Sequence, residues 1–372
     1  MKKILALLLA LTVLLSLAAC GGEKTPETTV PPTTEAPTTT EPETTPPTTE
    51  PETTPPTTVP ETEPPVLYRN PLSGEPLDAP HTARPYAVTI NNIKAAMPQC
   101  GVENANLVFE ILAEGGITRC LAVFDDLSGI EHLGAVRSAR TYFVDLALSL
   151  DAIYVHHGGS THGYDLIAST GADDLDAMKS SGSAAFYRDK DRLNAGVALE
   201  HTSFATGDKL IACAEKRYDL TREDGIDYGW TFVDDATPEN GADATSVTVR
   251  FTPNGKKTGF VYDAETGLYE ASQYGSDYID GNTGNTMAFK NLLVIKAKSW
   301  SDSEGYRQFV ELTRASGEGF YACNGKLIPI KWSRDGYNTP FVFTLEDGTP
   351  LELNVGNSYI AVTPKNGVVD YE

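Results

Sequence analysis

The chain has 372 residues, of which 22% are charged and 40% hydrophobic, and its formal net charge is -22 at pH 7. Binding to DNA, RNA or anionic lipid headgroups is driven mainly by Lys and Arg, so this acidic composition argues against a nucleic-acid partner. The length allows terminal segments together with two domains of ordinary size or one large domain.

Residues 1–20 have the pattern of a secretory leader. Lys2 and Lys3 form the basic start, an apolar run follows, and the segment ends with Leu17-Ala18-Ala19-Cys20. This ending resembles the lipobox of bacterial lipoproteins, which implies that Cys20 carries lipid, such as palmitate, and becomes the mature N-terminus. The run is too short for a comfortable membrane span. We therefore expect a lipid anchor on the outer face of the cytoplasmic membrane; an ordinary cleaved signal peptide is the alternative.

Residues 21–65 form a tract of Thr, Pro and Glu with almost no large apolar side chain. A segment of this composition cannot offset the entropy of ordering its backbone, so we expect a disordered stalk. The nine residues 39–47 are repeated without change at 48–56. Its prolines favour extended polyproline II structure. Such a stalk would hold a domain within a thick cell wall, which favours a Gram-positive bacterium.

Residues 66–219 show the alternation of short apolar strands and helical patterns that is typical of an α/β domain with a mixed sheet. Helices are expected around residues 138–150, with Ser138 as the cap, and at 208–218, with Thr206 as the cap. The expected strands are 86–90, 107–112, 120–124 and 152–155.

Residues 220–372 lack helical periodicity and contain a turn signal about every ten residues, such as Asn324-Gly325. The pattern predicts an antiparallel β-rich domain, a sandwich or a barrel, and an α+β fold overall. Its three tryptophans are expected mainly in the core or at its rim, with a carbohydrate-stacking platform as the alternative. The expected strands are 247–251, 260–262, 292–298, 309–313, 326–332, 341–345, 351–354 and 359–362.

The densest group of charged residues lies between residues 110 and 140. Glu110 interrupts an apolar strand and needs a cationic partner, for which Arg119, Arg137 and Arg140 are the candidates. Arg137 and Arg140 are expected on the first turn of a helix, where two guanidinium groups could hold a carboxylate or phosphate. The alternative is a structural role, in which these arginines bind Glu110, Glu114 and Asp145.

A second group, His156-His157-Gly158-Gly159-Ser160-Thr161-His162, directly follows a strand, where α/β sheets commonly bind ligands. Arg188 and His201 form a third group. A Ser/His/Asp triad is only weakly indicated, because no G-x-S-x-G motif is present. Metal-ligand spacing, a Walker loop and a dinucleotide fingerprint are also missing, so neither a metal nor a cofactor is expected. Cys100 and Cys120 could form a disulfide or remain buried thiols.

These segments resemble the YerB-type lipoproteins, whose halves are the DUF3048 N-terminal and C-terminal domains. The most specific matches are Glu114-Gly115-Gly116-Ile117-Thr118-Arg119 and Val136-Arg137-Ser138-Ala139-Arg140. The resemblance implies a secreted, lipid-anchored protein with two domains, and it implies no particular reaction. The chain departs from the expected pattern at His201-Thr202, where an asparagine is expected after the histidine.

Two classes of function remain open. The first is a binding module that uses an Arg/Glu/His cleft of the N-terminal domain to hold an anionic cell-wall component or an envelope protein. The second is a cell-wall hydrolase or transferase, with Glu110 or Glu114 and His156 or His201 as acid and base. The predicted ligand-binding residues are Glu110, Glu114, Arg119, Arg137, Arg140, His156, Arg188 and His201.

Overall fold

The computed structural model describes residues 68–222, 225–303 and 307–372. The predicted leader, the lipidation site at Cys20 and the stalk lie outside these residues. The described residues all belong to one compact unit. In the part of the chain that is described, no helix has the length and apolar character needed to cross a membrane.

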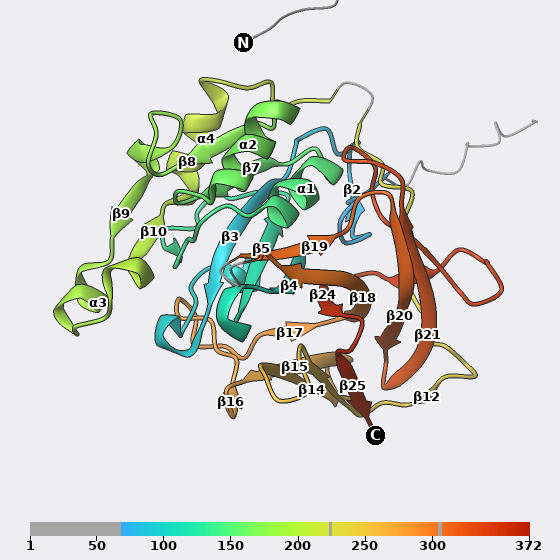
Figure 1. Cartoon of the computed structure of the whole chain (residues 1–372). Coiled ribbons are helices and arrows are strands. Elements are labelled where there is room, and N and C mark those ends of the chain that lie inside the picture. The colour runs from blue at the N-terminus through green and yellow to red at the C-terminus, as the bar shows by residue number, and fades with distance from the viewer. Residues whose placement is uncertain (1–67, 223–224, 304–306) are drawn as a thin grey trace, which may run out of the picture. The chain divides into compact units, whose positions relative to one another are not determined.

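A twelve-stranded sheet contains strands from both halves of the chain (Figure 1). Its order is β12-β21-β20-β18-β24-β4-β5-β3-β7-β8, with β19 paired to β18 and β22 paired to β21. The strands are β3 (Tyr86–Asn92), β4 (Leu107–Leu112), β5 (Thr118–Phe124), β7 (Ile153–His156), β8 (Asp174–Asp176), β12 (Ala242–Asp243), β18 (Asn291–Ser301), β19 (Gln308–Glu311), β20 (Ala315–Cys323), β21 (Lys326–Arg334), β22 (Val342–Thr344) and β24 (Ser358–Pro364).

Strand β24 joins the two halves. It pairs in parallel with β18 on one side and with β4 on the other, so that Ile360 lies opposite both Leu293 and Phe109. The turn pattern had predicted an antiparallel C-terminal domain. The parallel pairing of β18 with β24 shows that this half is not purely antiparallel. The two predicted domains share one continuous sheet, and the boundary at residues 219 and 220 stays a prediction.

The remaining strands form smaller sheets, of which a six-stranded one packs against the large sheet. It has the order β16-β15-β14-β13-β25, with β17 paired to β15. Its strands are β13 (Ser246–Arg250), β14 (Lys257–Asp263), β15 (Leu268–Gln273), β16 (Ser276–Asp277), β17 (Ala288–Phe289) and β25 (Val368–Tyr371). The other strands are β1 (Tyr68–Arg69), β2 (Pro76–Leu77), β6 (Leu133–Gly134), β9 (Phe186–Arg188), β10 (Ser203–Ala205), β11 (Thr231–Val233) and β23 (Glu352–Asn354).

Within the described residues, the α-helices all belong to the N-terminal half (Figure 1). They are α1 (Thr141–Ser149), α2 (Thr161–Thr170), α3 (Lys190–Asn194) and α4 (Gly207–Glu215). The single-turn 3₁₀ helices are η1 (Lys94–Ala96), η2 (Val102–Asn104), η3 (Glu114–Gly116), η4 (Ser183–Ala185) and η5 (Leu199–His201). Ser160 caps α2 by accepting a hydrogen bond from the Gly163 amide, as expected for a serine at this position.

Hydrophobic side chains lie on both faces of the large sheet. Successive residues of a strand point to opposite faces, and strands such as β4 and β5 are buried along their whole length. On β4, Phe109 points to the face that packs with Phe143 of α1. Val108 points to the opposite face, where it belongs to the same buried cluster as Phe260 of the six-stranded sheet. Glu110 lies on this second face, so its carboxylate enters the core between the two sheets.

The α+β fold class is confirmed, and each predicted strand corresponds to an observed one within a few residues. Asn324 and Gly325 have φ values of 47° and 74° and connect β20 to β21, as the Asn-Gly signal predicted. The prediction of Ser138 as a helix cap was wrong, because α1 begins at Thr141 after Arg140. Thr206 occupies the N-cap of α4, although its side chain forms no capping hydrogen bond. The four described cysteines, including Cys100 and Cys120, are buried free thiols.

Candidate functional site

Glu110 is completely buried and accepts hydrogen bonds from five side chains. The nearest cation is Lys256, whose Nζ lies 2.9 Å from Oε1 and whose side chain is 3% exposed. This lysine comes from the C-terminal half, 146 residues further along the chain. The other four donors are Asn92, Thr118, Thr258 and Tyr359.

The predicted partners of Glu110 were therefore wrong, since its cation is Lys256 and none of the three arginines. Burial alone would raise the pKa of this carboxyl, but Lys256 and the surrounding hydroxyl donors hold the pKa below its ordinary value. A carboxylate with so many donors and no exposed surface is a structural link between the two sheets. It does not lie in an open cleft with the other predicted residues.

Glu114 is the carboxylate that the arginines bind. Its two oxygens accept from Nε and Nη2 of Arg140 at 2.5 and 3.1 Å, which is the fork geometry of a strong ion pair. Arg119 approaches the same carboxylate at 3.3 Å. Burial opposes ionisation of Glu114, but these two arginines lower its pKa, so it stays ionised at neutral pH.

Arg119 has spare hydrogen-bonding capacity. It is 4% exposed, yet its Nε and Nη1 atoms have no hydrogen-bond partner among the described residues. Burial and the neighbouring charges of Arg140 and Arg137 lower its pKa to about 10. An unpaired buried donor costs on the order of 1–3 kcal/mol, so an acceptor reaching these nitrogens would be stabilising.

Arg137 does not lie on a helical turn, contrary to the prediction. It belongs to an extended segment beside β3, where its amide donates to the carbonyl of Thr89. Arg140 occupies the N-cap of α1. Their proximity therefore comes from this extended segment and not from a shared helical turn. Arg137 has one guanidinium bond, to the Glu200 carbonyl at 3.3 Å, and a buried Nε without a partner within the described ranges.

A pocket of about 270 Å³ lies beside Arg137 and Arg188. Among the described residues, neither arginine forms an ion pair. The lining residues of this His157 pocket are Val136, Arg137, Ser138, His157, Arg188, Leu199, Glu200 and Ser203. We refer to Arg119, Arg137, Arg140 and Arg188 together as the arginine cluster.

His157 was not among the eight predicted ligand-binding residues, but it lines this pocket. Its hydrogen bonds define its tautomer. Arg188 donates from Nη2 to His157 Nε2 at 3.2 Å, and a guanidinium can only donate. The imidazole proton therefore sits on Nδ1, which donates to Ser203 Oγ at 2.5 Å. Burial and the positive charges of Arg188 and Arg137 lower the pKa of His157. In this arrangement, His157 cannot take a proton from Ser203, whereas the serine hydroxyl can donate to a bound group.

His156 is buried beneath the loop that follows β7. Its Nε2 lies 3.0 Å from Asp174 Oδ2 and its Nδ1 lies 2.8 Å from the Gly158 carbonyl. Ligand atoms of His156, Asp174 and Asp176 lie within 4.8 Å of one another, a grouping that could hold a metal ion. Asp176, however, already accepts from Tyr164 and from two backbone amides. The hydrogen bonds present give this group a structural role.

His201 lies next to the His157 pocket. Its Nδ1 accepts from the side-chain Nδ2 of Asn91 at 2.8 Å, which directs Nε2 towards the exposed carboxylate of Glu200 at 3.5 Å. Thr202, at the position where asparagine was expected, donates to the Leu199 carbonyl. Of the eight predicted residues, six therefore lie in or around the arginine cluster, whereas Glu110 and His156 are buried in separate hydrogen-bond networks.

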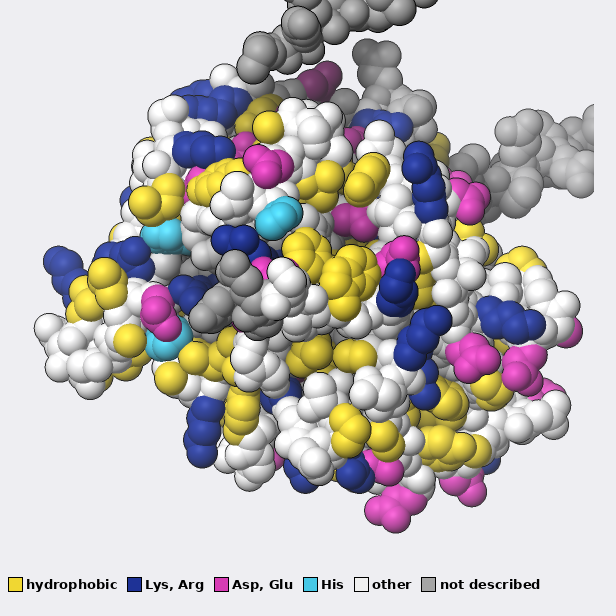
Figure 2. Space-filling model, in the orientation of Figure 1, with side chains coloured by type: hydrophobic (Ala, Val, Ile, Leu, Met, Phe, Trp, Pro, Cys, Tyr) yellow, Lys and Arg dark blue, Asp and Glu magenta, His cyan; other side chains and the backbone are white. Residues whose placement is uncertain are grey.

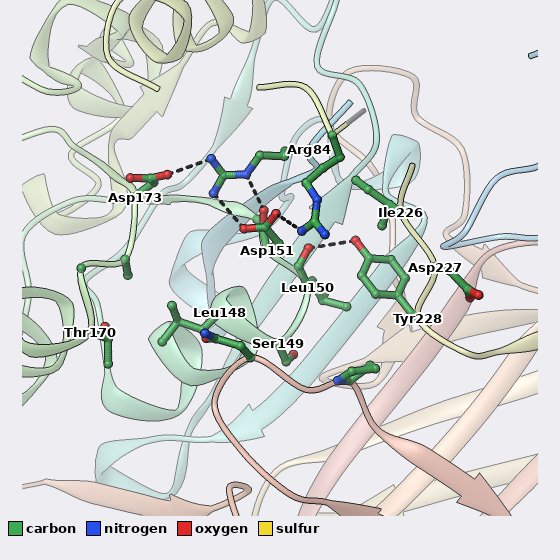
Figure 3. Close-up of a pocket in the computed structure, with 16 residues that line it drawn as sticks. Arg84, Leu148, Ser149, Leu150, Asp151, Thr170, Asp173, Ile226, Asp227 and Tyr228 are labelled. Carbon is green, nitrogen blue, oxygen red and sulfur yellow. Dashed lines mark hydrogen bonds and ion pairs between the residues drawn. The ribbon is translucent and has the colours of Figure 1, made fainter. Parts of the chain in front are cut away.

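A separate cavity of about 380 Å³ lies at the amino ends of β3 and β7 (Figure 3). Arg84 bridges Asp151 and Asp173 there, at 3.2 and 2.8 Å. Tyr228 donates to the Leu150 carbonyl. Because these charged groups bind one another, the cavity is a weaker candidate than the arginine cluster for holding a charged ligand.

On the face shown in Figure 2, Lys and Arg side chains lie beside hydrophobic ones near the middle of the molecule. In the same orientation, α1 and β19 lie in this middle region (Figure 1).

Comparisons with known proteins agree with this architecture. Residues 72–221 match the family described as "Protein of unknown function (DUF3048) N-terminal domain", and residues 247–360 match its C-terminal domain. The putative lipoprotein YerB of Bacillus subtilis (strain 168) is 31% identical over 285 residues, which cover 76% of this chain and 81% of that protein.

The crystal structure of YerB protein from Bacillus subtilis superposes with a TM-score of 0.70 at 27% identity, covering 81% of this chain and 99% of the other. Sequence and fold thus agree over both halves of the described region. The chain belongs to the YerB-type family of proteins with DUF3048 N-terminal and C-terminal domains.

Proposed function

We propose that this protein is a lipid-anchored component of a Gram-positive cell envelope that binds an anionic group of a cell-wall polymer. The arginine cluster is the binding site, and the phosphate or carboxylate of the polymer is its ligand. The leader ending in Cys20 and the relative described as a putative lipoprotein support the anchor. The proline-rich tract after Cys20 would provide reach into the wall.

The observation that carries the binding proposal is the excess of guanidinium groups over carboxylates. Glu114 is shared by Arg140 and Arg119, while Arg137 and Arg188 have no ion-pair partner in the described structure. Two nitrogens of the buried Arg119 also lack an acceptor. A bound anion would supply the missing acceptors and reduce repulsion within the cluster.

The acid–base alternative has less support from the geometry. Glu110 and His156 are fully buried, and Glu114 is held ionised by two arginines, which makes it a poor proton donor. The tautomer of His157 also opposes activation of Ser203. A binding module therefore agrees better with the positions of these groups than a hydrolase or transferase does.

Replacing Arg137 or Arg188 with Lys is expected to weaken anion binding by about tenfold or more. Each Lys keeps the charge but loses the fork geometry, and a hydrogen bond to a charged group contributes about 1.5–3 kcal/mol. The measurement is calorimetric titration of the full-length protein in detergent with inorganic phosphate and with soluble teichoic acid fragments. Thermal unfolding should remain close to that of the wild type.

Arg250→Lys is the matched control, because Arg250 is partly exposed and pairs with Asp370 on the six-stranded sheet. It should leave binding unchanged. Equal affinities for wild type and both cluster variants would place the site elsewhere, and unfolding of those variants would assign the arginines a structural role. New products after incubation with fragmented cell wall would instead support an enzyme.

A further inference from the structure

A groove of about 500 Å³ lies between helices α1 and α2 and the β18–β19 ribbon. It combines side chains from both halves of the chain. We call it the aromatic groove. The residues most relevant to ligand binding are Tyr142, His162, Asp165, Trp300, Phe309 and Glu311. None of them belongs to the predicted set of binding residues.

Aromatic rings form one side of this groove. Trp300 and Phe309 stack across the β18–β19 ladder with their centroids 5.6 Å apart and an interplanar angle of 13°. His162 meets Phe309 edge-on at 5.3 Å. Lys298 Nζ lies 5.2 Å from the Trp300 ring centroid, yet Trp300 remains 44% exposed. Large aromatic side chains exposed beside a cavity are typical of ligand-binding surfaces.

Tyr142 provides a second, independent indication of a ligand. It lines the groove and is 1% exposed, but its hydroxyl has no hydrogen-bond partner among the described residues. Burial raises its pKa strongly, so the hydroxyl stays protonated and can both donate and accept. An unpaired buried hydroxyl is unfavourable, and since the charges that act on it are those of Arg119, Glu114 and Arg140, a polar group of a ligand that extends from the groove towards the arginine cluster would satisfy it.

Two further polar groups of the groove are carboxylates, which accept hydrogen bonds and cannot donate them when ionised. Asp165 is an exposed carboxylate on α2, and Glu311 is a carboxylate on β19 that pairs with Lys298 at 3.2 Å. Carboxylates repel anions and accept hydrogen bonds from hydroxyl groups. Aromatic rings beside such acceptors suit a neutral, polyhydroxylated ring whose C–H groups contact the aromatics and whose O–H groups donate.

The groove adjoins the arginine cluster at the start of α1. Arg140 immediately precedes Thr141 and Tyr142, both of which line the groove. The charges of Arg119 and Arg140 act on the Tyr142 hydroxyl and oppose the effect of its burial. A ligand spanning both sites would therefore place a neutral ring and a negatively charged group next to each other.

We propose that the aromatic groove binds a sugar ring of a glycan, and that the negatively charged substituents of this glycan reach the arginine cluster. The inference rests on the proposed anion site and names the class of ligand. A glycan that carries carboxylate or phosphate groups has both required features. Neither site alone would hold such a ligand as well, because linking two contacts raises the effective concentration at the second.

The test uses three probes with the full-length protein in detergent. The first is a neutral tetramer of N-acetylglucosamine, the second is inorganic phosphate, and the third is a peptidoglycan glycan fragment with lactyl carboxylates. Trp300→Ala should weaken binding of the tetramer and of the fragment by about tenfold, the upper range of one aromatic contact. It should leave phosphate binding unchanged, whereas Arg137→Lys should weaken binding of phosphate and fragment.

Two further variants sharpen the result. Tyr142→Phe removes only the hydroxyl and should weaken binding of the charged glycan fragment, which spans both sites, without unfolding the protein. Tyr371→Ala removes an aromatic that is 42% exposed on the six-stranded sheet, and it should change nothing. No detectable binding of the tetramer at millimolar concentration, or equal binding by wild type and Trp300→Ala, would overturn the sugar site even if phosphate binding is observed. If the wild type binds the tetramer but not phosphate, the proposed anion site is wrong and the sugar site still holds.

Discussion

Lys256→Met is expected to lower the free energy of unfolding by about 3–5 kcal/mol, the usual cost of leaving one member of a buried ion pair without its partner. Glu110 is 0% exposed, and Lys256 is its only ion-pair partner among the described residues. Methionine preserves much of the volume but removes the charge. Chemical denaturation followed by circular dichroism measures the change.

Lys257→Met is a closely matched control, because Lys257 is the next residue and is exposed. It should change stability by less than about 0.5 kcal/mol. The double replacement Glu110→Leu with Lys256→Met should recover part of the loss, since it removes both buried charges. Equal stability of wild type and Lys256→Met would show that Glu110 does not depend on this lysine.

The acid sensitivity of the protein should change with Glu110. Its pKa in the folded protein is held below the value of an unfolded chain, about 4.3. The stabilising contribution is therefore present above that pH and is lost as the pH falls towards the lower, folded-state pKa. Glu110→Gln should unfold at a lower denaturant concentration at pH 7 but lose less stability than wild type between neutral and strongly acidic pH.

Cys20→Ser is expected to release nearly all of the protein from lipid attachment, because the Cys20 sulfur is the predicted acceptor of the lipid. The variant should appear either in the soluble fraction or as an unprocessed precursor. Membrane fractionation combined with intact mass spectrometry distinguishes these products from the mature, acylated protein.

Cys213→Ser tests whether losing any cysteine has this effect, since Cys213 is a buried thiol of α4. It should remain in the membrane fraction with the mass of the lipidated form. A Cys20→Ser protein of mature length that still sediments with membranes would contradict the lipid anchor, and with it the proposed position of the domains outside the membrane.

The secondary structure could be predicted from the sequence, because strands, helices and turns depend mainly on residues that are close together in the chain. A short apolar run predicted β4, and Asn324-Gly325 predicted the β20–β21 turn, since these residues adopt positive φ at low cost. The same signals indicated a binding region around Arg119, Arg137 and Arg140. The sequence also indicated the leader and the stalk from composition alone.

Only the tertiary structure decided which side chains meet. Lys256 reaches Glu110 because the six-stranded sheet packs on the large sheet, and no local pattern relates residues 146 positions apart. The parallel pairing of β24 with β4 likewise depends on long-range packing. Trp300 and Tyr142 line one groove for the same reason. Periodicity reports which face of an element is buried, whereas the partner across that face is selected by the packing of the whole core.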